Sequence, residues 1–309
     1  MTDPFHLGAR PDYDIGQVRA RRLVEWNGQL FTRADAYGQL DRDAWESERA
    51  WLDGRFWDPA SDGVTLTVQS FLLETPDHVI LVDTGIGNGK SRPSAPPFSD
   101  LDTPFLDQLS ATGITPADID IVVLTHLHSD HVGWNTTRVD DTWVPTFPQA
   151  RYLIPRADYD FFHPAGSGAE HVDADMEQVF ADSIDPILGA GQGEFWDGHL
   201  QLADGIDLHR VPGHTPGSGV LTVQSGDHSA QFVGDLLSTP MMVGHPDLCA
   251  HYGEHDVDVS PRQIRAARRD LLTRAARRGT RVVPAHFNLD AGHFVAHGPN
   301  GFSFIETQN

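Results

Sequence analysis

The sequence predicts a layered α/β fold, in which helices cover sheets. Two observations point to it. Runs rich in Val, Ile, Leu and Thr alternate with helix-like segments in both halves of the chain, as in layered α/β proteins. The run at 119–125 (IDIVVLT) is continuously apolar and rich in β-branched residues, which is typical of a strand covered on both faces. Because no low-complexity tract divides the 309 residues, we expect one domain, residues 1–309, built of two similar halves.

The first elements are expected to be strands joined by turns. In residues 18–34 an Asn27-Gly28 pair separates two mixed apolar runs. This pair is the commonest short hairpin signal, so we expect an opening hairpin. Residues 62–84 hold two more strand-like runs around a Thr-Pro-Asp turn. The second of these runs ends in the triplet Asp83-Thr84-Gly85.

A loop and a helix come before the next strand. Residues 85–100 are dense in Gly, Pro and Ser, a composition that predicts an irregular and mobile loop. A helix is expected at 104–111, closed by Gly113. The buried strand at 119–125 follows and leads directly into the motif Thr-His-Leu-His-Ser-Asp-His.

The second half of the chain repeats the alternation of strands and helices. Strands are expected at 150–155, 206–211, 219–224, 229–233 and 281–284, and helices from 157 onward and over 168–183. The clearest helix begins at Ser260-Pro261-Arg262-Gln263, which combines a capping box with Pro at the first helical position. It ends at Gly279.

The charge of the chain argues against two classes of partner. Lys and Arg number 22, Asp and Glu number 44, and the formal net charge is -22 at pH 7. Such a surface repels phosphate backbones and anionic membranes, so nucleic acid is a poor partner. The sequence also lacks an apolar run of roughly 18 residues, the length that spans a bilayer. We therefore expect no membrane partner.

The N-terminus and the cysteine content indicate the cellular compartment and the types of residue that can bind a metal. The opening MTDPFHLGARPDYD lacks the apolar centre of a signal peptide, so we expect a cytoplasmic protein. Cys249 is the only cysteine, which rules out an intrachain disulfide and a metal site with several thiolates. Any metal must therefore be held by His, Asp or Glu.

The motif after the buried strand has the density of a metal site. His126 and His128 are two residues apart at a strand end, so their side chains point to the same side and can converge on one ion. The chain then turns, and Asp130 and His131 can face a neighbouring ion. Imidazole and carboxylate ligands suit zinc, and manganese or iron less well. A single histidine would be structural more often than not, but this cluster predicts a metal centre.

Two ions need more ligands, and three later residues are candidates. His214 lies in a Gly- and Pro-rich tight loop, whereas Asp235 and His286 each follow a strand. Any one of them alone is more often structural. Because strand ends in a layered α/β fold gather at one edge, we expect these residues to join the motif there.

These motifs resemble those of the metallo-β-lactamase-fold hydrolases. The resemblance covers His-x-His-x-Asp-His at 126–131, Gly-His-Thr-Pro-Gly at 213–217, Gly-Asp at 234–235 and Pro-Ala-His at 284–286. The Asp-Thr-Gly triplet at 83–85 matches as well, so the resemblance spans about residues 60–290. It implies a four-layer αβ/βα sandwich with metals in a cleft at one edge.

The resemblance also implies a role for each residue. It assigns His126, His128 and His214 to a first Zn²⁺ ion, assigns Asp130, His131 and His286 to a second, and makes Asp235 the bridge. Mn²⁺ or Fe²⁺ are the alternative metals. In this pattern the metals activate a water molecule as hydroxide, and Asp130 orients it or carries a proton to the leaving group. Asp83 is expected to accept a hydrogen bond from a ligand histidine, although a strand-terminal Asp that caps its own turn is almost as common.

Positions at which this sequence differs from particular branches of the family limit the possible classes of substrate. Asp235 stands where zinc β-lactamases commonly have Cys or another ligand, His128 stands where redox members have Glu, and Trp134 follows Gly133 where thioesterases have a second Gly. Ser238 replaces the Tyr that lactonases often carry three residues after the bridging Asp. The pattern resembles the lactonase and organophosphate-hydrolase-like branch most. It implies hydrolysis of a small-molecule lactone or carboxylic ester, with phosphotriesters or thioesters as alternatives.

Two other classes of function are disfavoured. A nuclease or phosphodiesterase fits poorly with the charge of -22 and the absence of a basic run near the motif. A non-catalytic metal-binding module would not need Asp130, and every ligand position is intact. The partner is expected to be a small-molecule substrate, and an exposed hairpin at the N-terminus could support a homodimer.

Overall fold

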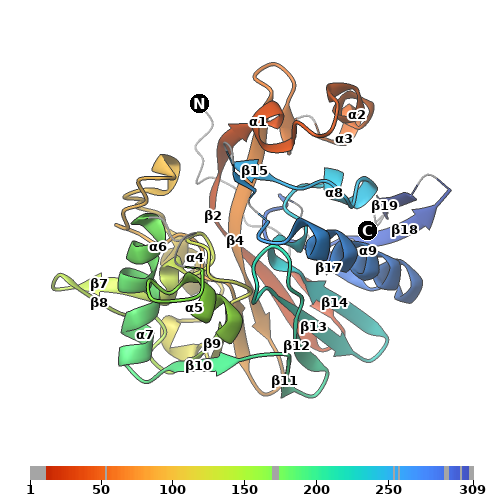
Figure 1. Ribbon diagram of the computed structural model, residues 1–309. Helices are drawn as coiled ribbons and strands as arrows, with labels where there is room; N and C mark the ends of the chain where they lie inside the picture. The colour runs from red at the N-terminus through yellow and green to blue at the C-terminus, as the bar shows by residue number, and fades with distance from the viewer. Residues whose placement is uncertain are drawn as a thin grey trace.

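A computed structural model of the chain describes residues 12–52, 54–168, 174–252, 255–256, 258–288, 292–299 and 301–305. It has the four-layer sandwich of the metallo-β-lactamase fold, with two sheets packed face to face and helices on both outer faces (Figure 1). Helices α4, α5, α6 and α7 lie on one flank, and α8 and α9 lie on the other. The predicted fold class is therefore confirmed.

The first sheet is mixed. Its order is β1 (Tyr13–Ile15), β2 (Val18–Thr32), β4 (Gly63–Glu74), β5 (Val79–Val82), β6 (Ile121–Val123), β9 (Arg151–Pro155) and β10 (Gly193–Trp196), and β3 (Trp57–Asp58) pairs with β4. Strands β5, β6, β9 and β10 are parallel, whereas β1, β2, β4 and β5 pair antiparallel. All three residues of β6 are buried, as the continuous apolar run predicts.

Among the described residues, the second sheet has five strands. They are β11 (His199–Ala203), β12 (Ile206–Arg210), β13 (Gly219–Ser225), β14 (His228–Phe232) and β17 (Arg281–Val283), in that order. Strands β12, β13 and β14 are successively antiparallel, and β14 is parallel to β17. Consequently β12, β14 and β17 run in the same direction, and their carboxyl ends meet at one edge of the sheet.

Apolar side chains from the inner faces of the two sheets form the central core. They include Phe71, Leu73, Ile80, Ile121 and Val123 from the first sheet and Leu208, Leu221, Val223, Phe232 and Val283 from the second. Packing of this core fixes the two sheets against each other, so the loops at their common edge are held at defined positions.

The outer faces are covered by helices. On the first sheet lie α4 (Phe105–Ala111), α5 (Arg156–Phe162), α6 (Ala174–Val179), a π-helical turn (Phe180–Ile184) and α7 (Asp185–Gly189). On the second lie α8 (Met241–Gly244) and α9 (Pro261–Arg278), together with α1 (Arg33–Tyr37), α2 (Arg42–Ser47) and α3 (Arg49–Leu52). Each outer layer buries its own apolar cluster against a sheet, which completes the four layers.

Small elements complete the chain. In the part of the chain that the structure describes, two-stranded ribbons pair β7 (Thr136–Val139) with β8 (Thr142–Pro145), β15 (His251–Tyr252) with β16 (His255–Asp256), and β18 (Phe294–Gly298) with β19 (Gly301–Ile305). Single 3₁₀ turns lie at Pro96–Phe98, Pro116–Asp118, Gly133–Asn135 and Gly234–Leu236. Among the described residues, no helix is both long enough and apolar enough to cross a bilayer.

The predicted opening hairpin is wrong. Residues 18–32 form the single long strand β2, and Asn27-Gly28 lies inside it, opposite Thr67 and Leu66 of β4. The Asn27 side chain accepts a hydrogen bond of 2.6 Å from the Thr67 hydroxyl. The tight turn instead joins β1 to β2 at Gly16, which has φ of 61°. Long-range pairing with β4 outweighs the local turn preference of the pair.

Most other predicted elements are confirmed. The strands at 62–84, 119–125, 150–155, 206–211, 219–224, 229–233 and 281–284 and the helices at 104–111 and 261–278 all appear, with ends shifted by a few residues. Residues 169–173 of the predicted helix at 168–183 lie outside the described residues. The capping box is wrong, because the Ser260 side chain makes no capping hydrogen bond, whereas Gly279 ends α9 in the left-handed conformation as expected.

Candidate metal centre

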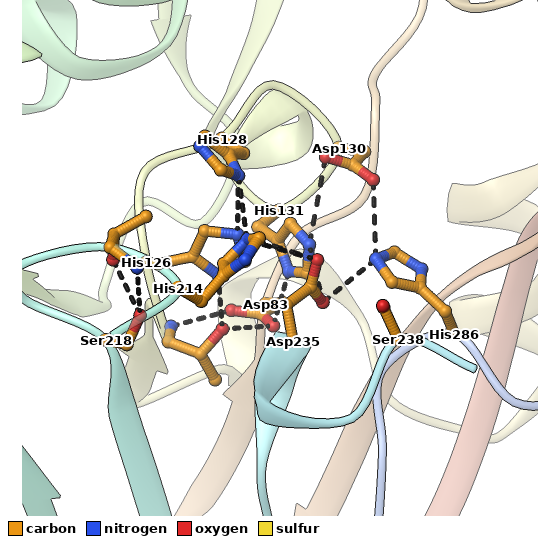
Figure 2. A network of polar contacts seen from close by, with 12 residues as sticks. Asp83, His126, His128, Asp130, His131, His214, Ser218, Asp235, Ser238 and His286 are labelled. Carbon is orange, nitrogen blue, oxygen red and sulfur yellow. Dashed lines mark hydrogen bonds and ion pairs between the residues drawn. The ribbon is translucent and has the colours of Figure 1, made fainter. Parts of the chain in front are cut away.

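The structure brings all seven predicted ligand residues to the common edge of the two sheets (Figure 2). His126, His128, Asp130 and His131 follow β6, His214 follows β12, Asp235 follows β14 and His286 follows β17. Four of the five histidines are at most 3% exposed. Residues up to 160 positions apart in the sequence therefore form one buried polar cluster.

Three histidines form the first half of the cluster. The Nε2 atom of His126 lies 3.1 Å from Nδ1 of His128, and Nε2 of His214 lies 3.1 Å from the same atom. The Oδ2 atom of Asp235 lies 3.4 Å from the His214 Nε2 atom and 4.0 Å from that of His126. Three imidazole nitrogens and one carboxylate oxygen thus converge on one point.

In the second half of the cluster, carboxylate oxygens again lie close to imidazole nitrogens. The Oδ1 atom of Asp235 lies 2.9 Å from Nε2 of His286 and 3.4 Å from Nε2 of His131. Asp130 reaches both of these histidines, with Oδ1 3.7 Å from His131 and Oδ2 3.5 Å from His286. The two oxygens of Asp235 therefore face different halves, and this carboxylate joins them.

Hydrogen bonds outside the cluster fix the histidine rings. Three Nδ1 atoms lie next to acceptors: His131 at 2.8 Å from Asp83 Oδ2, His214 at 3.0 Å from Asp258 Oδ1, and His286 at 2.9 Å from the Thr67 carbonyl oxygen. A carboxylate or a carbonyl oxygen can only accept, so each Nδ1 carries the proton and donates it. In the neutral form of each ring, the Nε2 atom is then left with a lone pair directed into the cluster.

Asp83 supports two rings at once. Its Oδ1 accepts from the backbone N–H of Thr125 at 2.7 Å, and its Oδ2 accepts from the Thr125 hydroxyl at 2.8 Å as well as from His131. Because the Thr125 hydroxyl donates to Asp83, its oxygen can accept from Nδ1 of His126, which lies 3.2 Å away. Asp83 thus accepts a hydrogen bond directly from His131 and supports His126 through the Thr125 hydroxyl.

Burial and charge act on the cluster in opposite directions. Burial lowers the pKa of His126 well below its ordinary value and lowers the pKa of His128 to about 3, and neighbouring histidines add to the effect. Burial would also lower the pKa of His131, but the carboxylates of Asp235, Asp130 and Asp83 raise it well above its ordinary value. His126 and His128 are therefore neutral imidazoles, whereas the carboxylates around His131 concentrate negative charge that a cation would offset.

The donor set fits divalent metal ions. Nε2 of His131 and Oδ1 of Asp235 are buried and make no well-aligned hydrogen bond with a described residue, although these two atoms lie 3.4 Å from each other. Leaving such atoms unpaired costs about 1–3 kcal/mol each, so a native protein rarely does so without a reason. In the first half, the ring protons of His126 and His214 lie on their Nδ1 atoms, so their Nε2 atoms carry none. Only Nδ1 of His128 can hold a proton between these three nitrogens. A cation in each half would satisfy these lone pairs, and nitrogen and carboxylate donors suit zinc.

Two carboxylates that support the cluster could not be predicted from the sequence. Asp258, which follows β16, fixes the His214 ring. Asp158 in α5 accepts from the backbone N–H of Leu127 at 3.2 Å and from the Thr215 hydroxyl at 2.9 Å, and it also accepts from the Gly217 N–H. It therefore joins the two loops that carry His126 and His214. Neither residue belongs to a motif, and only the fold brings them to the cluster.

A third buried carboxylate holds the loop at 85–100. Glu25 of β2 is 1% exposed and accepts from the backbone N–H groups of Ile86 at 2.6 Å and Gly87 at 3.0 Å. It also accepts from the indole N–H of Trp134 at 2.7 Å. The loop predicted to be mobile is thus tied to β2 and to the segment that follows the histidine motif. A side chain at Gly85 would collide with Glu25, since a Cβ there would lie 1.9 Å from Oε2.

Comparison with known proteins agrees with this geometry. The model of the metallo-beta-lactamase superfamily matches residues 63–286. Among curated relatives, an N-acyl homoserine lactonase of Bacillus sp is 27% identical over 172 residues, which are 52% of this chain and 59% of the relative. The N-acyl homoserine lactonase AttM of Rhizobium radiobacter is 32% identical over 133 residues, which are 41% of this chain and 44% of the relative. The chain spans about half the length of the curated relatives it matches.

Solved structures share the whole architecture. The structure titled hydrolase AbOPH in beta lactamase superfamily superposes with a TM-score of 0.79 at 18% identity, covering 98% of this chain and 99% of the other. AidC, titled a dizinc quorum-quenching lactonase in complex with a product, superposes with a TM-score of 0.76 at 21% identity, covering 99% of both chains. At these identities the likeness shows the fold.

Proposed function

Because the chain belongs to the metallo-beta-lactamase superfamily, we propose that it is a hydrolase that uses two divalent metal ions, foremost Zn²⁺, at the cluster around Asp235. Mn²⁺ or Fe²⁺ are the alternative metals. The observation that carries the proposal is the division of the Asp235 carboxylate, with Oδ2 directed at His214 and Oδ1 at His286. A carboxylate shared by two groups of nitrogen donors is suited to two ions rather than one.

The ligand sets follow from the two halves of the cluster. His126, His128 and His214 would hold the first ion, Asp130, His131 and His286 would hold the second, and Asp235 would contact both. When bound, such ions supply Lewis acidity, which lowers the pKa of water and polarises a carbonyl oxygen. Asp83 and Asp258 keep the ring protons on Nδ1 of His131 and His214, so the Nε2 lone pairs stay available.

Asp130 is our candidate for proton transfer. Its side chain is 14% exposed, more than that of His131, His286 or Asp235, so it lies at the mouth of the cluster. Its oxygens lie 3.5–3.7 Å from the two nearest nitrogens, whereas Asp235 comes within 2.9 Å of one. A carboxylate in this position can hold a water molecule by one oxygen and deliver a proton to a leaving oxygen.

We propose a small-molecule lactone or carboxylic ester as the substrate class. Two relatives named above are N-acyl homoserine lactonases, and AidC is titled a lactonase, which supports this choice. The net charge of -22 disfavours polyanionic substrates such as nucleic acids. Phosphotriesters and thioesters remain the alternatives.

Tyr37 supplies a hydroxyl that the sequence pattern lacks. It lies in α1, outside the region matched by the family model, and its hydroxyl is 3.5 Å from the Ser238 Oγ atom. Burial raises the pKa of Tyr37, and the charges of Asp258 and Asp235 act in the same direction, so the phenol stays protonated. We propose that Tyr37 and Ser238 together provide hydrogen-bond donors beside the cluster.

Metal analysis paired with a hydrolysis screen tests the proposed function. Metal content per chain is measured on the purified full chain, and the same preparation is assayed with lactones, aryl esters, thioesters and phosphotriesters. We expect about two ions per chain and turnover of lactones or carboxylic esters. Turnover of another class alone would reject the substrate assignment. Fewer than one ion after metal loading, or two ions without any turnover, would reject the dinuclear hydrolase.

A further inference from the structure

A second group of metal-ligating side chains lies on the β11–β12 hairpin. It consists of His199, Asp207 and His209, and we call it the hairpin cluster. One ligand atom from each residue lies within 4.8 Å of the others. None of the three belongs to the centre around Asp235, and His209 precedes His214 by five residues on the same segment.

The ladder between the two strands places the histidines as close as a sheet allows. His199 is paired directly with His209. In the adjacent pair, the backbone N–H of Arg210 donates to the Gly198 carbonyl at 2.8 Å, so Gly198 and Arg210 form a hydrogen-bonded pair. Because hydrogen-bonded and non-hydrogen-bonded pairs alternate in antiparallel ladders, His199 and His209 form a non-hydrogen-bonded pair, in which side chains approach most closely.

Asp207 completes one face of the hairpin. It precedes His209 by two residues on β12, so both side chains project from the same face. Its Oδ1 atom lies 2.8 Å from Nε2 of His199, and the two imidazole rings are stacked with centroids 4.6 Å apart and planes 10° apart. The cluster thus joins two imidazoles and one carboxylate across two strands.

The cluster is open to solvent and to exchange of its protons. The side chains of His199 and Asp207 are 55% and 28% exposed, so water can complete a coordination sphere. Burial and the neighbouring His199 lower the pKa of His209, which favours the neutral imidazole that a metal requires. The net charge of the chain, -22, raises the local concentration of cations.

We propose that the hairpin cluster binds one divalent first-row transition metal ion, such as Zn²⁺, Ni²⁺ or Cu²⁺, separately from the centre around Asp235. Two imidazoles and one carboxylate with open positions are a ligand set for such ions. A bound ion would cross-link β11, the edge strand of the second sheet, to β12. This inference does not depend on the proposed hydrolase activity.

Counting ions with and without the two histidines tests the proposal. The full chain and the double variant His199→Gln/His209→Gln are each equilibrated with Zn²⁺, freed of excess ion and analysed for zinc per chain. We expect the double variant to hold one ion fewer, with unchanged hydrolytic turnover. A matched variant, His228→Gln, removes an exposed histidine from β14 of the same sheet and should hold as many ions as the unaltered chain. Equal zinc in the unaltered chain and the double variant would overturn the proposal.

A second background separates this proposal from the function proposed above. Asp235→Ala is expected to impair the binding of metal at the centre around Asp235 and leaves the residues of the hairpin cluster unchanged. Adding the double substitution to this background should again remove one ion per chain. Circular dichroism checks that each variant is folded. Both histidines are exposed, so we expect their replacement to leave the fold intact. If the two Asp235→Ala chains hold the same amount of zinc, the hairpin cluster does not bind metal.

Discussion

The Oδ1 atom of Asp258 lies 3.0 Å from Nδ1 of His214, and both side chains are buried. Its other oxygen, Oδ2, has no hydrogen-bond partner among the described residues. Among the described residues, the Asp258 side chain therefore accepts a hydrogen bond from His214 alone. This bond keeps the ring proton on Nδ1, so the lone pair on Nε2 of His214 points into the cluster. Neither residue of this pair indicates the other in the sequence, since 44 positions separate them.

Substitution of Asp258 tests this contact. Asp258→Ala removes the acceptor, so we expect metal affinity to fall by about 10- to 100-fold, the usual effect of losing a hydrogen bond behind a ligand histidine. Asp258→Asn keeps an acceptor oxygen and should lose less. Competition with a chromophoric chelator measures the affinity, and Asp227→Ala, at an exposed position, is the control. Equal affinity in the Ala variant and the unaltered chain would contradict the role of Asp258.

Asp235 and Asp130 should separate metal binding from catalysis. Asp235→Ala removes the carboxylate shared by both halves, so we expect activity to be abolished and metal content to fall. Asp130→Asn keeps an oxygen near His131 and His286 but loses the ability to carry a proton. It should spare more metal than activity. Elemental analysis and kcat on the same preparations measure both effects, and equal losses in both variants would refute the separate role of Asp130.

Tyr37→Phe tests the hydroxyl beside Ser238. The ring remains in its buried position against Trp45 and Phe31, so the variant should fold normally. Loss of one hydrogen-bond donor costs about 1.4 kcal/mol, so we expect kcat/KM to fall about 10-fold. Metal content should not change. Tyr13→Phe, which alters a tyrosine of β1, is the control, and an unchanged kcat/KM for Tyr37→Phe would exclude the proposed role.

The Glu25 carboxyl should make stability depend on pH. Burial raises its pKa from 4.5 to about 7, although hydrogen bonds from Ile86, Trp134 and Gly87 oppose the shift. A carboxyl whose pKa is higher in the folded chain than in the unfolded chain stabilises the fold fully below about pH 4.5. That contribution is lost as the pH rises through about 7, and it amounts to roughly 3 kcal/mol.

Comparison with Glu25→Gln isolates this contribution. The variant cannot titrate at this position, and its amide meets N–H donors, so it should be less stable overall. The free energy of unfolding is measured by urea denaturation between pH 4.5 and 8 for both chains. The stability advantage of the unaltered chain should shrink as the pH rises through this range. Parallel curves for the two chains would show that Glu25 titrates alike in the folded and unfolded states.

Local patterns account for the elements that the sequence predicted correctly. The continuous β-branched run of β6 and the Pro and Gly that bound α9 act over a few residues, so the sequence reports them directly. Asn27-Gly28 failed as a turn because pairing between β2 and β4, an interaction over about 40 residues, decided its conformation. The residues of the cluster around Asp235 could be named from the sequence because they lie in short motifs that follow strands.

The sequence by itself determined the residue types of the proposed ligands, their order and the ends of the strands that carry them. Only the tertiary structure decided how these residues divide into two halves, since Asp235 is placed between them by the common direction of β12, β14 and β17. It also decided which carboxylates support the rings. Asp158 and Asp258 lie in no motif, and they act because the packing of two sheets and their helices brings their oxygens within hydrogen-bonding distance of remote loops. Hydrogen bonds form at contact distance, and the fold alone sets the contacts between distant parts of the chain.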